Sequence, residues 1–271
     1  MLEAVLLLRG NGFNGRKCDA VLESRFEVGD FLRQLAEVRS GEAVLDVGCG
    51  TGEMTVKLAY LAYPGRALGI DTARGMLETA VIRAEANGLN NIAFRLWDMQ
   101  EFGFNGEFDL IFSNSALQWV HNQKTLLEGL IRALRRGGRL ALQLMAKDFS
   151  PPFLAALDKV VEEMIPHCAY RGGRYPWFMG EEDSYARMVT DAGFTQADIF
   201  RREWPIRFAS VNAAVEFFRV ADLLPYLVLL PETEHTVFCM RLAEELEVQY
   251  GEGEFDLPFD RLFVMARKSA F

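Results

Sequence analysis

Three glycines at alternate positions, Gly48, Gly50 and Gly52, follow an apolar run and precede a helical pattern in the stretch VLDVGCGTGEMTVKLA. A turn built from glycines brings the backbone close to a ligand, because no β-carbon stands in the way. The same kind of turn can also serve only for tight packing. The glycines therefore indicate a ligand site only where neighbouring residues supply matching chemistry.

Acidic residues lie at the ends of the strands expected around this turn. Asp46 precedes the glycines, Asp71 ends the next strand, and Asp98 ends the third strand beside Met99. In open α/β sheets, ligands bind beyond the carboxyl ends of the strands, where a carboxylate can accept hydrogen bonds from ribose hydroxyls. Each acid alone could be a helix cap or a solvated turn residue. Three in succession indicate a nucleoside site.

The nucleoside expected here carries no phosphate close to the turn. A dinucleotide motif, G-x-G-x-x-G, would place glycine at position 53, where the sequence has Glu53. Its carboxylate would oppose a pyrophosphate at the start of the following helix, where anions otherwise bind. A nucleoside with a cationic centre near Asp46 fits these residues better.

The elements that must position these residues alternate along the chain. Apolar runs alternate with helical patterns from residue 43 to 145, which predicts a parallel sheet covered by helices. The expected strands are 43–48, 66–71, 91–97, 108–114 and 139–146, and the expected helices are 52–62, 73–87 and 123–136.

After residue 146 the rhythm changes, and the remaining elements are expected to cover the ligand edge of the sheet. We expect helices over 150–165 and 181–192, a strand over 196–208 interrupted near Pro205, two further helical stretches, and a last strand over 257–266. No linker divides the chain. It is therefore interpreted as one domain, with a helical lid in 1–40, a cofactor-binding core in 41–146, and substrate-side insertions and last strands in 147–271.

The expected lid depends on one amphipathic pattern. Leu22, Phe26, Phe31 and Leu35 have helical spacing, so this segment could close over a ligand or could simply be a packing helix.

Composition narrows the class of protein further. The 271 residues carry a formal net charge of −9, which argues against a nucleic-acid partner. The four cysteines form no C-x-x-C pair and the three histidines have no metal-ligand spacing, so reduced thiols, no metal site and a cytoplasmic location are expected. No apolar stretch is long enough to span a membrane. The oligomeric state stays open.

The quoted motifs also resemble a known family. VLDVGCGTG, GIDTARGMLETA, LWDMQEF and FDLIFSNSALQWV are similar to the successive motifs of class I methyltransferases that use S-adenosyl-L-methionine and release S-adenosyl-L-homocysteine. The resemblance implies a Rossmann-like α/β fold, with a seven-stranded, mostly parallel sheet, helices on both faces and an antiparallel last strand.

The same resemblance implies roles for single residues. The three glycines would line the methionine and ribose portions of the cofactor. Asp46 would orient the turn or the amino group of the cofactor, Asp71 would bind the ribose hydroxyls, and Asp98 with Met99 would hold the adenine. The residues expected to bind the cofactor are Asp46, Gly48, Cys49, Gly50, Gly52, Asp71, Thr72, Met76, Asp98, Met99 and Ser113.

A narrower resemblance concerns the substrate. FSNSALQWV, GGRLALQLM and the C-terminal stretches EDSYARMVTDAGF, VEFFRVADLLPYL and LPFDRLFVMARK are similar to trans-aconitate methyltransferases, and the first two also to malonyl-carrier-protein methyltransferases. These families form methyl esters, so the resemblance implies a small carboxylic acid as substrate. A carboxylate is already nucleophilic and needs alignment, not a general base. His121 is therefore not expected to act as a base.

Two groups of residues are candidates for substrate contacts. Gln118 could orient a substrate oxygen and Trp119 could form a wall of the pocket, although Trp119 could equally be a core residue. The loop YRGGRYPWF could clamp a polyacid because arginine grips carboxylates with paired hydrogen bonds; alternatively it is a surface loop whose aromatic residues pack on the core. The loop residues concerned are Arg171, Arg174, Tyr175 and Trp177.

Two alternatives to a carboxylate methyltransferase stay open. The acceptor could be another small molecule or a carrier-bound group, because proximity and desolvation can drive much of a methyl transfer. The chain could also bind the nucleoside without turnover, and product formation would separate these hypotheses.

Overall fold

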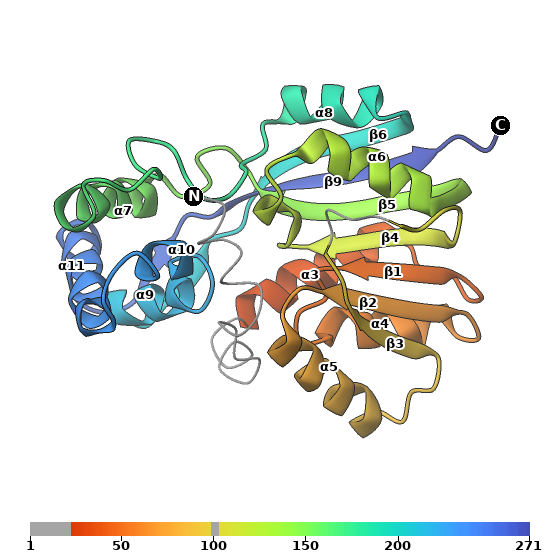
Figure 1. Ribbon diagram of the computed structural model, residues 1–271, viewed down its shortest axis with the longest axis horizontal. Helices are drawn as coiled ribbons and strands as arrows, with labels where there is room; N and C mark the ends of the chain where they lie inside the picture. The colour runs from red at the N-terminus through yellow and green to blue at the C-terminus, as the bar shows by residue number, and fades with distance from the viewer. Residues whose placement is uncertain (1–22, 99–102) are drawn as a thin grey trace.

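The computed structural model describes residues 23–98 and 103–271. Its centre is a seven-stranded sheet in the order β3-β2-β1-β4-β5-β9-β6, with helices on both faces (Figure 1). The strands are β1 (Ala43–Val47), β2 (Arg66–Asp71), β3 (Ile92–Leu96), β4 (Phe108–Asn114), β5 (Leu134–Met145), β6 (Phe194–Glu203) and β9 (Asp260–Lys268). The helices beside it are α3 (Glu23–Ala36), α4 (Glu53–Ala62), α5 (Arg74–Ala86), α6 (Gln123–Ala133) and α8 (Glu182–Asp191).

The direction of the strands confirms the expected Rossmann-like fold. β1 pairs in parallel with β2 and β4, β2 with β3, and β4 with β5. β9, the last strand of the chain, lies antiparallel between β5 and β6. Because Asp46 of β1 is level with Phe112 of β4, the carboxyl ends of these two strands lie side by side.

Two apolar layers cover the central strands. Leu110 and Phe112 of β4 pack with α3 and α4 on one face, whereas Ile111 packs with α6 and α8 on the other. All five residues of β1 are buried. A strand covered on both faces is apolar along most of its length, which is why the parallel core is readable from apolar runs; in β1 the exception is Asp46.

Some element boundaries differ from those expected. The helix predicted over 123–136 ends at Ala133, because β5 begins at Leu134 and bulges through the sequence RRGG before pairing regularly from Arg139. The strand predicted over 196–208 is split at Pro205, and its second part pairs with β8 instead of the main sheet. Proline removes a backbone donor and so interrupts the ladder.

A helical unit lies beyond the carboxyl ends of the parallel strands (Figure 1). The chain enters it after β5 ends at Met145, leaves it to form α8 and β6 of the central sheet, and returns to it before β9 begins. The unit has an aromatic core of its own. It consists of α7 (Pro151–Met164), α9 (Val211–Arg219), α10 (Leu224–Leu227), α11 (Glu232–Tyr250) and the pair β7 (Ile206–Phe208) and β8 (Phe255–Leu257).

The described part of the expected N-terminal lid is a packing helix. Val28 and Leu32 of α3 are fully buried against the sheet, and Phe31 contacts the ring of Phe263 at 5.2 Å. Residues 1–22, including Cys18, lie outside the described residues. The helical pattern is thus explained by burial for Glu23–Ala36, and a lid role for the remainder stays a prediction.

Three features of the described residues bear on other classes of site. No helix among them combines the length and apolar character needed to cross a bilayer. The same ranges contain no group of three or more histidine, cysteine, aspartate or glutamate side chains placed to hold a metal ion. Cys49, Cys168 and Cys239 are free thiols.

Candidate functional site

The glycine turn follows β1 at the carboxyl edge of the sheet, and its glycines have different surroundings. Gly48, Gly50 and Gly52 all have positive φ angles, of 72°, 54° and 78°. A β-carbon on Gly50 would meet nothing within 4 Å, so this part of the turn faces open space. A β-carbon on Gly52 would lie only 2.8 Å from Cβ of Ala80. The turn therefore offers its backbone to a ligand at Gly50 and packs tightly at Gly52.

Asp71 is tied to the same turn at the end of β2. The backbone amide of Gly50 donates to Asp71 Oδ2 at 2.9 Å, and the amide of Ala73 donates to Oδ1 at 2.8 Å. Burial raises the pKa of Asp71, and these amide hydrogen bonds offset part of the effect. The carboxylate is held in one orientation, and each of its oxygens has a further lone pair with which to accept from a hydroxyl.

Asp46 lies deeper, and only 2% of its surface is exposed. Thr55 Oγ1 donates to Asp46 Oδ2 at 2.6 Å. Burial raises the pKa of Asp46 to about 7; the hydrogen bond from Thr55 opposes this, and the negative charge of Asp71 adds to it. A positive charge near Asp46 would favour its ionised form. Thr55, on the helix after the turn, is a supporting residue that the motif did not identify.

The other predicted cofactor residues surround this edge in different ways. Cys49 is buried beneath the turn, and burial raises the pKa of its thiol well above the usual range. Met76 is buried in a small cluster with Ala73 and Val220, the last belonging to the helical unit. Thr72 and Asp98 are half-buried at the ends of β2 and β3, and Met99 lies outside the described residues.

Ser113 has a structural partner. Its side chain is completely buried, and its hydroxyl donates to the carbonyl oxygen of Val47 at 2.7 Å, tying β4 to β1. The hydroxyl therefore holds the sheet together and is not open to the edge. Ser115 lies one residue beyond the end of β4, and its Oγ donates to Gln143 Oε1 at 2.6 Å.

Gln118 and Trp119 lie in a short 3-10 helix, η1 (Leu117–Trp119), just beyond this point. Gln118 is almost fully buried; its Nε2 donates to the carbonyl oxygen of Ser115 at 2.9 Å, and its Oε1 has no hydrogen-bond partner among the described residues. Trp119 is half-buried, with its ring edge-on to Trp177 at 6.1 Å. The pair thus joins the carboxyl edge of β4 to the aromatic core of the helical unit.

The loop expected to clamp the substrate divides into two parts. Arg171 and Arg174 are exposed, and the guanidinium of Arg171 donates to the carbonyl oxygen of Pro166. Trp177 is buried and stacks on Tyr175, whose hydroxyl donates to Asp158 at 3.0 Å. The structure therefore places Trp177 in the aromatic core of the helical unit, beside Trp119, and leaves the two arginines at the surface.

A different arginine lies at the site. Arg261, the second residue of β9, is 1% exposed and pairs with Met145 at the end of β5. Its Nη1 lies 3.4 Å from Ser115 Oγ, and its Cζ lies 4.4 Å from the centre of the Phe259 ring. Sequence reasoning missed it. The available signal was one arginine inside the apolar run LPFDRLFVMA.

Comparison with known proteins places this geometry in a family. The family described as "Methyltransferase domain" matches residues 38–193. The trans-aconitate 2-methyltransferase of Rhizobium meliloti is 30% identical over 89% of this chain and 92% of its own, and that of Methylobacterium nodulans is 33% identical over 83% and 86%. The chain belongs to the class I S-adenosylmethionine-dependent methyltransferases.

Solved structures agree on the fold of this methyltransferase. The YcgJ protein of Bacillus subtilis superposes with a TM-score of 0.64 at 15% identity, over 90% of this chain and 99% of its own. A phosphoethanolamine N-methyltransferase of Haemonchus contortus, in complex with phosphomonomethylethanolamine and S-adenosylhomocysteine, gives 0.59 at 16% identity over 90% of this chain and 52% of its own.

The chemistry of the carboxyl edge fits the cofactor of this family. S-adenosylmethionine is a nucleoside with a cationic sulfonium centre and an amino group. The open side of Gly50 leaves room for such a ligand against the backbone. Asp71 offers acceptor oxygens for ribose hydroxyls, and Asp46 is a buried carboxylate that a nearby cation would stabilise in its charged form.

Proposed function

We propose that this methyltransferase O-methylates the carboxylate of a small organic acid and forms a methyl ester. The observation that carries the proposal is Arg261, a buried guanidinium beside Ser115 at the edge where the cofactor turn and the helical unit meet. Guanidinium groups recognise carboxylates through paired, charge-assisted hydrogen bonds. Likeness to two proteins named trans-aconitate 2-methyltransferase, over most of both chains, supports the same substrate class.

For the cofactor, we propose contacts along the first three strand ends. Asp71 binds the ribose hydroxyls, Asp98 with Met99 binds the adenine, and the backbone around Gly50 lies against the methionine and ribose portions. Asp46 attracts the cationic end of the cofactor. These roles are supported by the open turn and by the way two amides orient the carboxylate of Asp71.

The reaction requires alignment and charge neutralisation. When bound, the cofactor supplies an electrophilic methyl group on a positively charged sulfur. A carboxylate oxygen forms a new bond to the methyl carbon while the carbon–sulfur bond breaks and its electron pair stays on sulfur, giving the ester and S-adenosylhomocysteine. The guanidinium of Arg261 binds a carboxylate group of the substrate. Gln118 orients an oxygen of the substrate, and Trp119 shields the site from water. No proton has to be removed, in keeping with the exposed position of His121.

The direct test is a search for the ester. The purified protein is incubated with S-adenosylmethionine and a panel of mono-, di- and tricarboxylic acids, and methyl esters and S-adenosylhomocysteine are detected by mass spectrometry. We expect ester formation with at least one polycarboxylic acid and its loss in Arg261→Gln. Turnover only with amines or alcohols would overturn the carboxylate assignment, and cofactor binding without any turnover would indicate a binding module.

A further inference from the structure

Buried polar groups without a partner gather in the helical unit next to this site. Trp177 Nε1, the Tyr226 hydroxyl and Ser150 Oγ are inaccessible to solvent and have no hydrogen-bond partner among the described residues. Burying such a group without a partner costs free energy, so each one calls for an explanation. In the other buried apolar cluster that contains a tyrosine, the hydroxyl of Tyr185 is satisfied by Gln123 Oε1 at 2.9 Å.

Trp177 and Tyr226 belong to one chain of ring contacts that ends at Arg261, and Ser150 follows Phe149 of this chain in the sequence. The ring of Trp177 lies 6.2 Å from Tyr226 and 6.4 Å from Phe149. Phe149 lies 4.6 Å from Phe259, over which the guanidinium of Arg261 is placed. On its other side Trp177 meets Trp119, next to Gln118. Ring contacts therefore connect Trp177 and Tyr226 both to Trp119, shortly after the end of β4, and to Arg261.

All of these groups can donate a hydrogen bond. Indole nitrogen and guanidinium nitrogens can only donate hydrogen bonds, and the hydroxyls of tyrosine and serine can donate. Burial raises the pKa of Tyr226, so its hydroxyl keeps its proton throughout the physiological range. A ligand rich in acceptors can satisfy all of these groups, and carboxylate oxygens accept without donating.

We propose that Trp177 and Tyr226, together with Arg261, form a specificity pocket for the non-reacting carboxylates of a polycarboxylic acid. This inference rests on the proposed function, since it assumes that another carboxylate of the same acid receives the methyl group. It assigns the selection of polyacids over monoacids to α10 and the buried end of the loop before α8. The exposed arginines of that loop are not needed for it.

The test separates binding from turnover. The protein saturated with S-adenosylhomocysteine is titrated calorimetrically with trans-aconitate, with tricarballylate, and with crotonate as a monocarboxylate of similar skeleton. Tyr226→Phe and Trp177→Phe remove one donor each and keep a ring in place. Tyr185→Phe is the matched control, because it removes a buried tyrosine hydroxyl that already has a partner.

We expect wild type to bind at least one tricarboxylate, and each pocket variant to weaken that binding about 10-fold or more while crotonate and S-adenosylhomocysteine binding stay unchanged. Tyr226→Phe should not lower the Tm, whereas Tyr185→Phe should lower the Tm and leave tricarboxylate affinity unaltered. Failure of wild type to bind either tricarboxylate, or equal affinities in wild type and both pocket variants, would overturn the pocket.

The proposed function is judged separately, by ester formation. Tricarboxylate binding that depends on Tyr226 and Trp177 but gives no ester would uphold the pocket and refute methyl transfer to an acid. Ester formation with unchanged affinity in the variants would do the reverse.

Discussion

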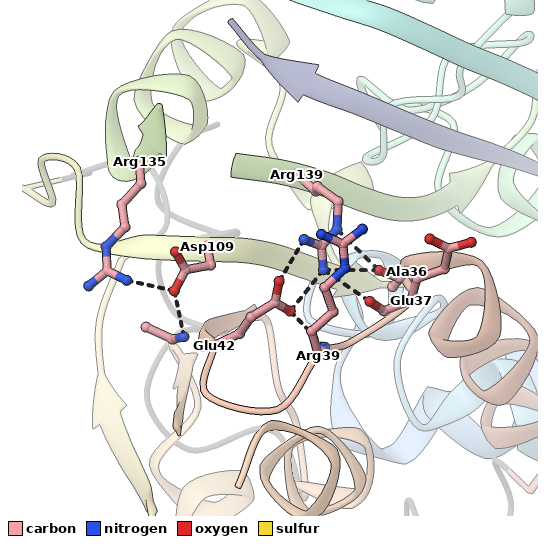
Figure 2. Close-up of polar contacts among 8 residues, drawn as sticks. Ala36, Glu37, Arg39, Glu42, Asp109, Arg135 and Arg139 are labelled. Carbon is pink, nitrogen blue, oxygen red and sulfur yellow. Dashed lines mark hydrogen bonds and ion pairs between the residues drawn. The ribbon is translucent and has the colours of Figure 1, made fainter. Parts of the chain in front are cut away.

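The two edges of the central sheet carry similar residue types in opposite arrangements. At the amino edge, Arg139 forms a paired salt bridge with Glu42, at 2.6 and 2.8 Å, and Arg135 lies 2.6 Å from Asp109 (Figure 2). At the carboxyl edge, the hydrogen bonds of Asp46 and Asp71 come from Thr55 and from backbone amides.

The pKa values of the aspartates at the two edges are shifted in opposite directions. Burial alone would raise the pKa of Asp109, but the amide of Ala43 and the guanidinium of Arg135 hold it below its ordinary value. Burial without an arginine raises the pKa of Asp46 and Asp71. One edge is therefore internally neutralised and stabilises the fold, while the other keeps carboxylates whose charge a cationic ligand can balance.

The largest effect should come from removing the Arg139–Glu42 salt bridge at the amino edge. Glu42→Ala would leave Arg139, with a side chain 8% exposed, without its carboxylate. We expect the free energy of unfolding to fall by about 3 kcal/mol, because an uncompensated buried charge is costly. Urea denaturation measures the loss, and the affinity for S-adenosylhomocysteine should hardly change.

Lys159→Ala is the matched control for that variant. Lys159 pairs with Glu245 but is 64% exposed, so its loss should cost about 0.5 kcal/mol or less. Equal losses in the two variants would mean that the amino-edge pair does not stabilise the fold as argued.

The next largest effect concerns the other edge. Asp71→Ala should weaken S-adenosylmethionine binding about 100-fold or more, since it removes the acceptor proposed for two ribose hydroxyls. Calorimetric titration measures this, with Asp109→Asn as a control that changes a carboxylate at the opposite edge. Undiminished affinity in Asp71→Ala would contradict the proposed ribose contact.

A pH effect of intermediate size should come from Asp46. In the unfolded chain an aspartate loses its proton near pH 3.8, whereas native Asp46 keeps it to about pH 7. Between these pH values the native state binds more protons, so the contribution of Asp46 to stability is lost as pH rises, by on the order of 2 kcal/mol. Urea denaturation at pH 5 and pH 8 should show this loss in the ligand-free protein and a smaller one in Asp46→Asn.

Cofactor binding should also depend on the protonation of Asp46. If the cationic end of the cofactor lies near Asp46, binding at pH 6 should release a proton, detected as a dependence of the calorimetric heat on the ionisation enthalpy of the buffer. The release should vanish in Asp46→Asn. Proton release that persists in this variant would have to come from another group.

The smallest effects should distinguish the glycines of the turn. Gly52→Ala should mainly lower stability, because its β-carbon would press on Ala80, whereas Gly50→Ala should mainly weaken cofactor binding. Both variants carry a backbone cost of about 1 kcal/mol, since both positions have positive φ. Subtracting the losses of one variant from those of the other removes this shared cost, and equal stability losses and equal binding losses in the two variants would refute the division of roles.

Most of the fold was predictable because its signals are local. Buried parallel strands read as apolar runs, and Gly48 to Gly52, Asp71 and Asp98 lie at strand ends whose direction follows from the alternation of strands and helices. Boundaries were less predictable where pairing overrode propensity. The bulge before Arg139 lengthened β5 at the expense of the preceding helix.

The substrate side was not predictable to the same degree. The loop pattern drew attention to Arg171 and Arg174, which the structure places at the surface. On the cofactor side, the hydroxyl of Ser113 donates to the carbonyl oxygen of Val47 within the sheet, which the sequence did not indicate. Whether a side chain faces solvent, the sheet or a cavity depends on packing that a short stretch of sequence does not contain.

The sequence by itself determined the glycine turn and the acidic strand ends at the carboxyl edge, where we propose that the nucleoside binds. These features depend on backbone geometry within successive βα units. Only the tertiary structure decided what lies opposite. Arg261 reaches Ser115 across 146 residues because β9 inserts antiparallel beside β5. Tyr226 of α10 reaches Trp177 because that helix and the loop before α8 share one aromatic core. Such contacts follow from long-range packing, whose partners no local pattern names.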